Sequence, residues 1–363
     1  MKNKKKFYKL CFLLLVLFLL PSGITHAEKT TTSDNDETTE TRKQAGFQVQ
    51  SVLPENQIND RVSYYHLLVH PGQTQTIELK IMNNSPETQH YTVEVIRAAT
   101  NKNGLITYDE RDKRPDESMR LPITDVAQPR SNEVSVKSYS EGKAEIDLSI
   151  PNDQPFEGIL LGGIRVSLKE GSTEDSETGL SVKNTYGYAI GMVLTEDEKN
   201  SIYGEPELKL TTVKPEVNYG SKILEASIQN PEPVSIKDAT VEGKIISKRT
   251  NKSVAEGKLK NVSIAPNSVF PFHIDWGMNQ IVAGEYTLKG IARIGDKKWQ
   301  FEQNFTISSK IAKKMNEQTV FKIIIPDWWM HTAYILIMVT VGVLVFLIVR
   351  LVKRTKGRKS NEA

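Results

Sequence analysis

The chain has 363 residues, a quarter of them charged, and a formal net charge of +3. Its bases are concentrated at the two ends, so residues 10–349 hold 36 lysines and arginines against 43 acidic residues, a net charge of about −7. This balance does not support a basic surface for nucleic acid. Cys11 is the only cysteine, and it lies in a predicted export signal, which leaves the mature chain without disulfides, thiol nucleophiles or cysteine metal ligands.

Residues 1–27 have the order of a secretory signal peptide. Lysines between residues 2 and 9 precede an apolar run at 10–20, and small residues end at Ala27. A first membrane span is the alternative, but the apolar run is short for one. A lysine-rich signal and a cysteine-free body favour a Gram-positive bacterium. Residues 28–45 are polar and predict a disordered spacer.

From residue 46 onward apolar residues alternate with polar ones, which predicts β-strands. Turn signals separate the runs, and short strands punctuated in this way are typical of an antiparallel β-sandwich. We predict a first sandwich over 46–203. Its alternating runs are Ile77–Ile81, Tyr91–Val95, Ala144–Ile150 and Ile164–Leu168, and its turn signals are Pro71-Gly72, Asn83-Asn84, Asn103-Gly104, Glu141-Gly142 and Pro151-Asn152.

The stretch PFEGILLGGIRV (155–166) carries Gly158, Gly162 and Gly163 within an apolar run. A phosphate loop requires a strand-to-helix turn followed by Lys and Ser or Thr, whereas more strand follows here. A membrane segment is excluded because Glu157 and Arg165 bracket only seven residues. We therefore interpret the three glycines as structural, in a buried strand with a kink or a close approach of another backbone.

A second sandwich is predicted over 204–310, after the joint Gly204-Glu205-Pro206. Alternating residues resume at Leu208 and continue to Phe305. The segments IELKIMNN and LEASIQN both end in Asn before a proline-bearing loop, which indicates a corner common to the two sandwiches. The predicted fold class is all-β, with two tandem immunoglobulin-like sandwiches and one C-terminal transmembrane helix.

Residues 311–331 predict an amphipathic juxtamembrane stalk, and residues 332–352 a transmembrane helix, because 332–349 carry no charge. A buried core helix is the alternative. Trp328, Trp329 and Tyr334 are the expected interface anchors on one side, and Arg350, Lys353 and Arg354 on the other. The basic tail, 353–363, predicts a single-pass protein of the cell membrane with an extracellular body and a cytoplasmic tail.

No catalytic motif stands out, and we expect no enzyme activity, no metal and no cofactor. His66 and His70 lie in a predicted strand, where four residues span about 13 Å, too far for one ion. Trp276 and Trp299 alternate with apolar neighbours and are expected in the core or at its rim rather than as a platform for sugars.

Several motifs resemble the WxL-interacting protein family of Gram-positive bacteria. VQSVLPENQ (49–57), YYHLLVHPGQTQTIELKIMN (64–83), AATNKNGLITY (98–108) and PFEGILLGGIRV are similar to its peptidoglycan-binding domain. LKNVSIAPNSVFPF (259–272) and AGEYTLKGIARIGDKKWQFEQNF (283–305) are similar to its host-binding domain.

The resemblance implies a non-enzymatic surface adaptor that binds peptidoglycan and tethers WxL-domain proteins. The alternative is an adhesin whose second domain binds a host matrix protein such as fibronectin. The candidate peptidoglycan contacts are polar side chains within these motifs: Asn56, Gln57, Tyr65, Asn101 and Asn103.

Overall fold

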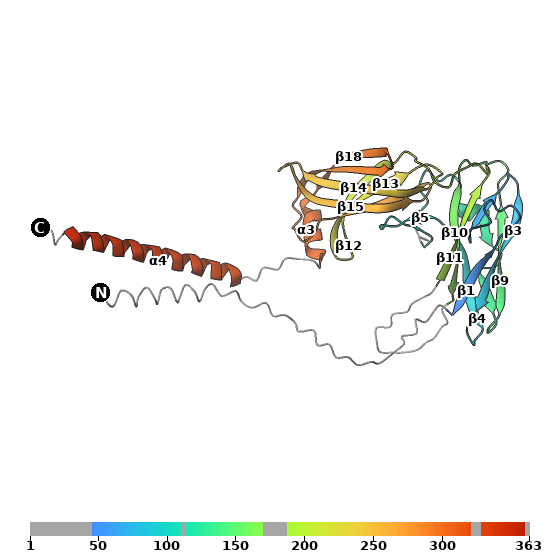
Figure 1. Ribbon diagram of the computed structural model, residues 1–363, viewed down its shortest axis with the longest axis horizontal. Coiled ribbons are helices and arrows are strands. Elements are labelled where there is room, and N and C mark those ends of the chain that lie inside the picture. The colour runs from blue at the N-terminus through green and yellow to red at the C-terminus, as the bar shows by residue number, and fades with distance from the viewer. Residues whose placement is uncertain (1–45, 110–113, 170–186, 321–327, 360–363) are drawn as a thin grey trace. The chain divides into compact units, whose positions relative to one another are not determined.

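The computed structural model describes residues 46–109, 114–169, 187–320 and 328–359. The predicted signal peptide and spacer lie outside the described residues. The described strands form two tandem immunoglobulin-like β-sandwiches (Figure 1), which confirms the predicted fold class.

The first sandwich consists of a four-stranded sheet with the order β1-β3-β9-β7 and a five-stranded sheet with the order β2-β11-β10-β4-β8. Apart from the parallel pair β2 and β11, the neighbours are antiparallel. The strands are β1 (Phe47–Val52), β2 (Tyr65–Leu68), β3 (Thr74–Asn83), β4 (Gln89–Arg97), β7 (Ala127–Pro129), β8 (Glu133–Val136), β9 (Glu141–Ser149), β10 (Leu160–Leu168) and β11 (Gly187–Thr195).

The second sandwich consists of a three-stranded sheet, β12-β13-β16, and a four-stranded sheet, β15-β14-β17-β18, all antiparallel. The strands are β12 (Lys209–Asn218), β13 (Ser221–Asn230), β14 (Ile236–Ser247), β15 (Lys252–Ile264), β16 (Ser268–Asp275), β17 (Gly284–Ile294) and β18 (Lys297–Ile307). Two short elements complete the first part of the chain: the hairpin β5 (Ala99–Thr100) and β6 (Ile106–Thr107), and the one-turn helix α2 (Ile123–Val126).

Alternation in the sequence predicted the inward faces of the strands. Residues 77, 79 and 81 of β3 are buried in the first core, and Leu224, Ala226 and Ile228 of β13 are buried in the second. Each core is a separate apolar cluster, and Trp276 and Trp299 belong to the second, as expected. With no disulfide in the described residues, burial of these side chains is the main stabilising term.

One predicted turn was wrong. Glu141 and Gly142 begin strand β9, where they pair with Met82 and Ile81. The turn precedes them and contains Tyr139, whose φ is +49°. Gly142 is required in the strand because a Cβ there would lie 2.5 Å from Cγ2 of Val136.

Each sandwich has an equivalent corner at the end of a strand, and a buried asparagine stabilises it. Asn83 ends β3, and its Nδ2 donates to the carbonyls of Glu87 (2.7 Å) and Lys137 (3.0 Å). Asn230 ends β13, and its Nδ2 donates to the carbonyls of Val234 (2.7 Å) and Ala265 (2.9 Å). Where the chain leaves the sheet, backbone carbonyls lose their partners in the neighbouring strand. The asparagine amide donates to them instead, so these buried carbonyls stay hydrogen-bonded without water.

Helix α3 (Ser309–Gln318) occupies the first part of the predicted stalk. It is amphipathic as predicted, but its Ala312 and Met315 are buried in the second core, and Asn316 Nδ2 donates to the carbonyl of Ile281 at 2.9 Å. The segment up to Thr319 therefore packs on the second sandwich rather than extending from it as a free stalk.

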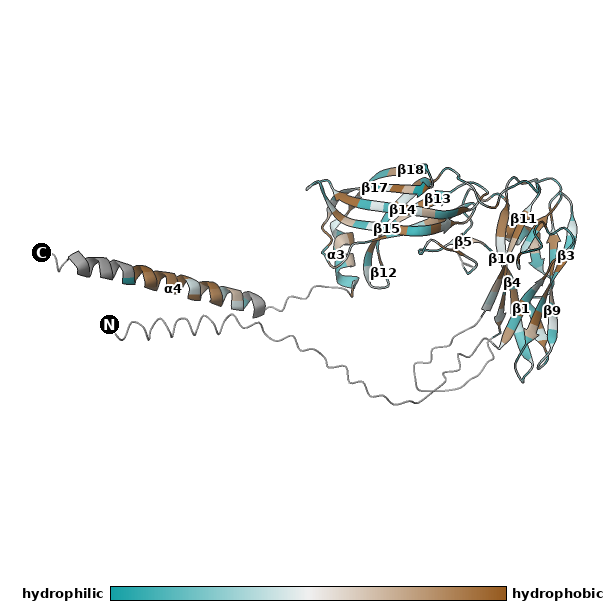
Figure 2. Ribbon diagram, viewed as in Figure 1, coloured by the Kyte–Doolittle hydropathy of each residue, from teal (hydrophilic) through white to brown (hydrophobic). Residues whose placement is uncertain are grey.

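Helix α4 (Trp328–Lys359) contains a 20-residue stretch, His331–Arg350, that is long and apolar enough to cross a membrane. Figure 2 shows the apolar residues along its middle. The predicted aromatic anchors Trp328, Trp329 and Tyr334 lie in its first two turns. At the other end, Arg350 closes the apolar stretch, and Lys353 and Arg354 follow it.

Candidate functional site

The glycine-rich strand β10 separates two apolar clusters. Ile164 and Val166 belong to the first core, whereas Leu161 belongs to a smaller cluster that also contains Ala98 and Val193. Gly162 approaches helix α2, and a Cβ on it would lie 2.4 Å from Cγ2 of Ile123. Apolar side chains therefore pack closely against both faces of β10.

The predicted kink in β10 is absent, because residues 160–167 pair with β11 without a register shift. The predicted close approach is present, but at Gly163 the approaching group is mainly the ring of Tyr108. A Cβ on Gly163 would lie 2.8 Å from Cγ of that ring, and 3.3 Å from the Ile190 carbonyl oxygen.

Gly158 differs from the two glycines inside the strand. Its φ is +68°, and a Cβ on it would lie 2.4 Å from the backbone oxygen of Pro233. A side chain on any of the three glycines of this stretch would therefore meet neighbouring atoms closer than 3.0 Å.

Three tyrosines line a pocket of about 480 Å³ beside β10 and β11. We call it the tyrosine pocket, and its aromatic residues are Tyr64, Tyr108 and Tyr203. Tyr108 lies across the paired glycines Gly163 and Gly191, with its hydroxyl 3.4 Å from the position of a Cβ on Gly191. Because Gly163 and Gly191 have no Cβ, the Tyr108 ring has room to pack directly on the backbone of these two residues.

Polar side chains also line the tyrosine pocket. Ser235 is fully buried and lines the pocket, and its Oγ has no hydrogen-bond partner among the residues that the structure describes. Lys237 is exposed, with its Nζ 5.4 Å from the centre of the Tyr203 ring. Burial, together with the nearby phenols of Tyr203 and Tyr64, raises the pKa of Tyr108 to about 12, so its hydroxyl is a neutral donor at physiological pH.

The β5–β6 hairpin links the tyrosine pocket to the second sandwich. The Thr100 hydroxyl accepts from the backbone N–H of Ala265 at 2.9 Å and lies 3.1 Å from Ser268 Oγ. At the tip of the hairpin, the Gly104 carbonyl accepts from the N–H of Ser263 at 2.7 Å. The hairpin thus bonds to the second sandwich, while Tyr108, which follows it, packs on the first.

Two of the predicted peptidoglycan contacts have structural roles. Asn56 and Gln75 exchange hydrogen bonds of 3.0 and 2.9 Å through their amides, and Asn56 also donates to the Leu68 carbonyl. Gln57 donates to the Tyr64 carbonyl at 3.1 Å and accepts from the N–H of His66 at 3.0 Å. These amides satisfy the backbone of an irregular loop, a common role of half-buried amides.

The other three predicted contacts differ in their exposure. Tyr65 is fully buried, and its hydroxyl donates to the Glu78 carbonyl at 2.7 Å, so it is not available to a ligand. Asn101 Oδ1 accepts from the N–H groups of Asn103 and Leu105 and shapes the hairpin turn. Asn103 is exposed at that turn, whereas Asn56, Gln57 and Asn101 are partly buried.

The two histidines of the first sandwich lie in different surroundings. His66 is buried in β2, where burial lowers its pKa, whereas His70 lies beyond the strand and is exposed. The structure does not bring them together among the groups that could hold a metal ion.

Sequence patterns gave no sign of the tyrosine pocket, because its aromatic residues lie in three segments far apart in the chain. They also missed a group in the second sandwich. Within the described ranges, Glu216, Glu225 and His273 form a set that could hold a metal ion.

Two family models match the chain in tandem. Residues 47–168 match the WxL Interacting Protein peptidoglycan binding domain, and residues 177–317 match the WxL Interacting Protein host binding domain. The chain belongs to the WxL-interacting protein family. The second match begins before β11, although β11 is hydrogen-bonded between β2 and β10 and completes a sheet of the first sandwich.

No curated protein matches this WxL-interacting protein in sequence. Two solved chaperone structures have a similar arrangement. The YadV chaperone is 12% identical, and the match covers 72% of this chain and 100% of that chain with a TM-score of 0.28. The Pseudomonas aeruginosa CupB2 chaperone is 14% identical, and the match covers 66% of this chain and 97% of that chain with a TM-score of 0.28. The PapD-like domain 7 of human CEP192 is 9% identical, and the match covers 50% of this chain and 99% of that chain with a TM-score of 0.25. At these TM-scores the likenesses carry no functional information.

Replacing Gly163 with alanine is expected to destabilise the first sandwich. The added Cβ meets the ring of Tyr108, and overpacking of this kind costs about 1–3 kcal/mol in the free energy of unfolding. Denaturant titration measures the loss. Gly46→Ala is the matched control, because the nearest atom to its Cβ is Ser85 Cβ at 3.8 Å.

In a chain that also carries Tyr108→Ala, Gly163→Ala should lower the free energy of unfolding by less, since the ring that clashes with the new Cβ is gone. An equal cost with and without the ring would show that Gly163 is required for another reason.

Proposed function

We propose that this protein is a cell-surface adaptor that is anchored by α4, binds peptidoglycan through its first sandwich and tethers WxL-domain proteins through its second. The observation that carries the proposal is the tandem match to a peptidoglycan binding and a host binding domain, followed by a helix that could span a membrane. The basic residues beyond the apolar stretch favour a cytoplasmic tail and an extracellular body. The families are binding domains, which is consistent with a non-enzymatic role.

We place the glycan contact in the tyrosine pocket, where Tyr64 and Tyr108 of the first part of the chain meet Lys237 of the second sandwich, so the second sandwich borders the glycan site. Aromatic ring faces pack against the C–H faces of sugar rings, and the phenol groups match sugar hydroxyl and acetamido groups. The ammonium group of Lys237 complements the carboxylates of peptidoglycan. A concave site with aromatic walls and a few polar groups is the usual form of a small-ligand site. This assignment replaces Asn56, Gln57 and Tyr65, whose side chains are occupied within the fold.

The second candidate function is direct adhesion to a host matrix protein such as fibronectin. It is favoured by the host binding description of the second family model. The two functions place different partners on the second sandwich, so they are separable by capture experiments.

Replacing Tyr203 with alanine should weaken peptidoglycan binding with little change in thermal stability, because 48% of this side chain is exposed. Loss of one aromatic contact costs about 0.5–1.5 kcal/mol, which corresponds to roughly a 2- to 12-fold weaker affinity. Cosedimentation of the full chain with purified peptidoglycan measures the change. Tyr139→Ala, at an exposed tyrosine outside the pocket, is the control. Equal binding by the Tyr203→Ala and wild-type chains would place the glycan elsewhere.

The tethering role predicts that the immobilised full chain captures a purified WxL-domain protein and retains little fibronectin. Surface plasmon resonance with both analytes separates the two candidate functions. Capture of fibronectin alone would favour the adhesin, and capture of neither would contradict both.

A further inference from the structure

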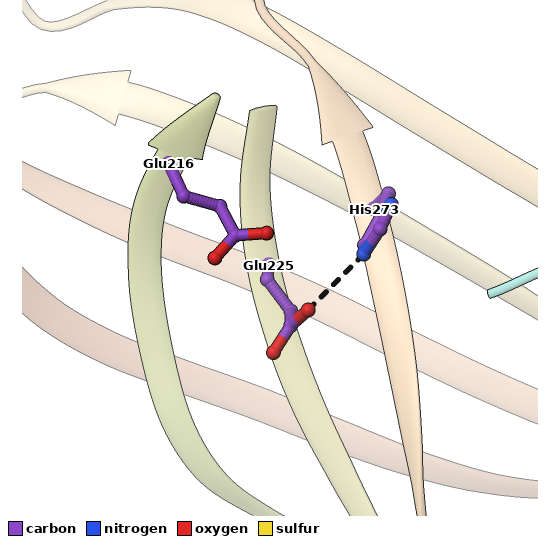
Figure 3. A group of neighbouring side chains, drawn as sticks. All are labelled: Glu216, Glu225 and His273. Carbon is purple, nitrogen blue, oxygen red and sulfur yellow. Dashed lines mark hydrogen bonds and ion pairs between the residues drawn. The ribbon is translucent and has the colours of Figure 1, made fainter. Parts of the chain in front are cut away.

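Three potential metal ligands lie together on the sheet β12-β13-β16, and Figure 3 shows their side chains converging. Glu225 of β13 and His273 of β16 are directly opposed in the strand register. Glu216 of β12 is paired with Ile223, two residues before Glu225. Since residues two apart share a face of a sheet, three adjacent strands present one donor each to the same point.

The donor atoms are already close to the spacing of ligands around an ion. His273 Nε2 lies 3.1 Å from Glu225 Oε2, and one donor atom from each of the three residues lies within 4.8 Å of the others. Metal–ligand bonds of about 2.0–2.2 Å put two ligands of one zinc ion roughly 3.4 Å apart in tetrahedral geometry. The three donors are therefore at most about 1.4 Å from the spacing that one zinc ion requires.

Burial distinguishes this group from ion pairs on the surface. The side chains of His273 and Glu225 are 18% and 24% exposed, whereas in the pairs Lys143–Glu78 and Lys258–Glu242 the lysine is more than half exposed. Water screens charges less in a half-buried setting, so the mutual repulsion of Glu216 and Glu225 is larger. A divalent cation between them would remove that repulsion.

The group opens onto a cavity of about 750 Å³ that is lined by Glu225 and His273 together with Asn218 and Tyr219. The cavity leaves space for water or a further ligand to complete the coordination. Several polar and basic groups near the cavity compete with an ion, among them Arg97 and Lys102 in its lining. Asn218 Nδ2 lies 3.5 Å from Glu216 Oε1, and Lys214, opposite Glu225 in the register, is exposed.

We propose that Glu216, Glu225 and His273 bind one divalent transition-metal ion of the zinc type. Two carboxylates and an imidazole suit such ions, whereas calcium prefers six to eight oxygen ligands and magnesium keeps a shell of water. The bound ion links the edge strand β12 to β13 and β16. This site lies in the second sandwich, and it does not depend on the proposed adaptor function.

Calorimetric titration of the metal-free full chain in detergent with Zn²⁺ tests the site. The wild type should bind one equivalent, and His273→Gln and Glu216→Gln should each weaken binding at least tenfold. His70→Gln, which changes an exposed histidine in the first sandwich, should leave binding unchanged, and Mg²⁺ should not bind. Co²⁺ should give the absorption bands of a protein-bound ion in the wild type only.

A thermal measurement separates loss of metal binding from folding defects. Zn²⁺ should raise the unfolding midpoint of the wild type, because it binds the folded chain, and should leave that of Glu216→Gln unchanged. The variant midpoints without metal report whether the variants fold. Stoichiometric Zn²⁺ binding that survives both substitutions would overturn the assignment, as would failure of the wild type to bind.

Discussion

The packing of the Tyr108 ring on Gly163 and Gly191 is the contact on which the candidate site depends. The two glycines are cross-strand partners in β10 and β11, and any side chain on Gly163 would displace the ring. Because the ring lies on the sheet, the β5–β6 hairpin that precedes it is held against the first sandwich. The sheet is apolar there, at Leu161 and Val193, and would otherwise expose these side chains to water.

The same hairpin is bonded to the second sandwich, so the contact also couples the two sandwiches. Thr100 bonds to Ala265, and Ala265 belongs to the same apolar cluster as Leu161. The tyrosine pocket lies where these elements meet, with Tyr108 from the first part of the chain and Ser235 from the second. A ligand bound there would contact both sandwiches, which offers a physical route for wall binding to affect the partner-binding half.

Local patterns were sufficient to predict the sandwiches, because burial on one face of a strand imposes an alternation of period two. Strand β3 is a typical case, with Leu79 fully buried and its neighbour Lys80 partly exposed. The asparagine corner was also visible, since Asn83 and Asn230 occupy equivalent ends of strands. The turn predicted at residues 141–142 was wrong because glycine in β9 serves the close approach of Val136, which the sequence does not reveal.

The candidate site could not be predicted, because it depends on contacts between distant segments. Asn56 and Gln57 are polar residues of the kind that often contact ligands, yet their amides donate hydrogen bonds to backbone carbonyls around an irregular loop. Tyr108 gave no local signal either, since the glycines that it covers lie about 55 and 83 residues further along the chain. The three donors of the proposed metal site likewise come together only through the register of three strands.

Coupling of the two sandwiches through Tyr108 is tested most directly by tryptophan fluorescence. Trp276 and Trp299 are buried in the second core, and the other two of the four tryptophans, Trp328 and Trp329, are replaced by phenylalanine so that the signal reports the second sandwich. Tyr108→Ala, a change in the first part of the chain, should lower the thermal midpoint seen by this fluorescence relative to the parent chain. A fluorescence midpoint that stays the same, while circular dichroism shows part of the β-structure unfolding at a lower temperature, would contradict the coupling.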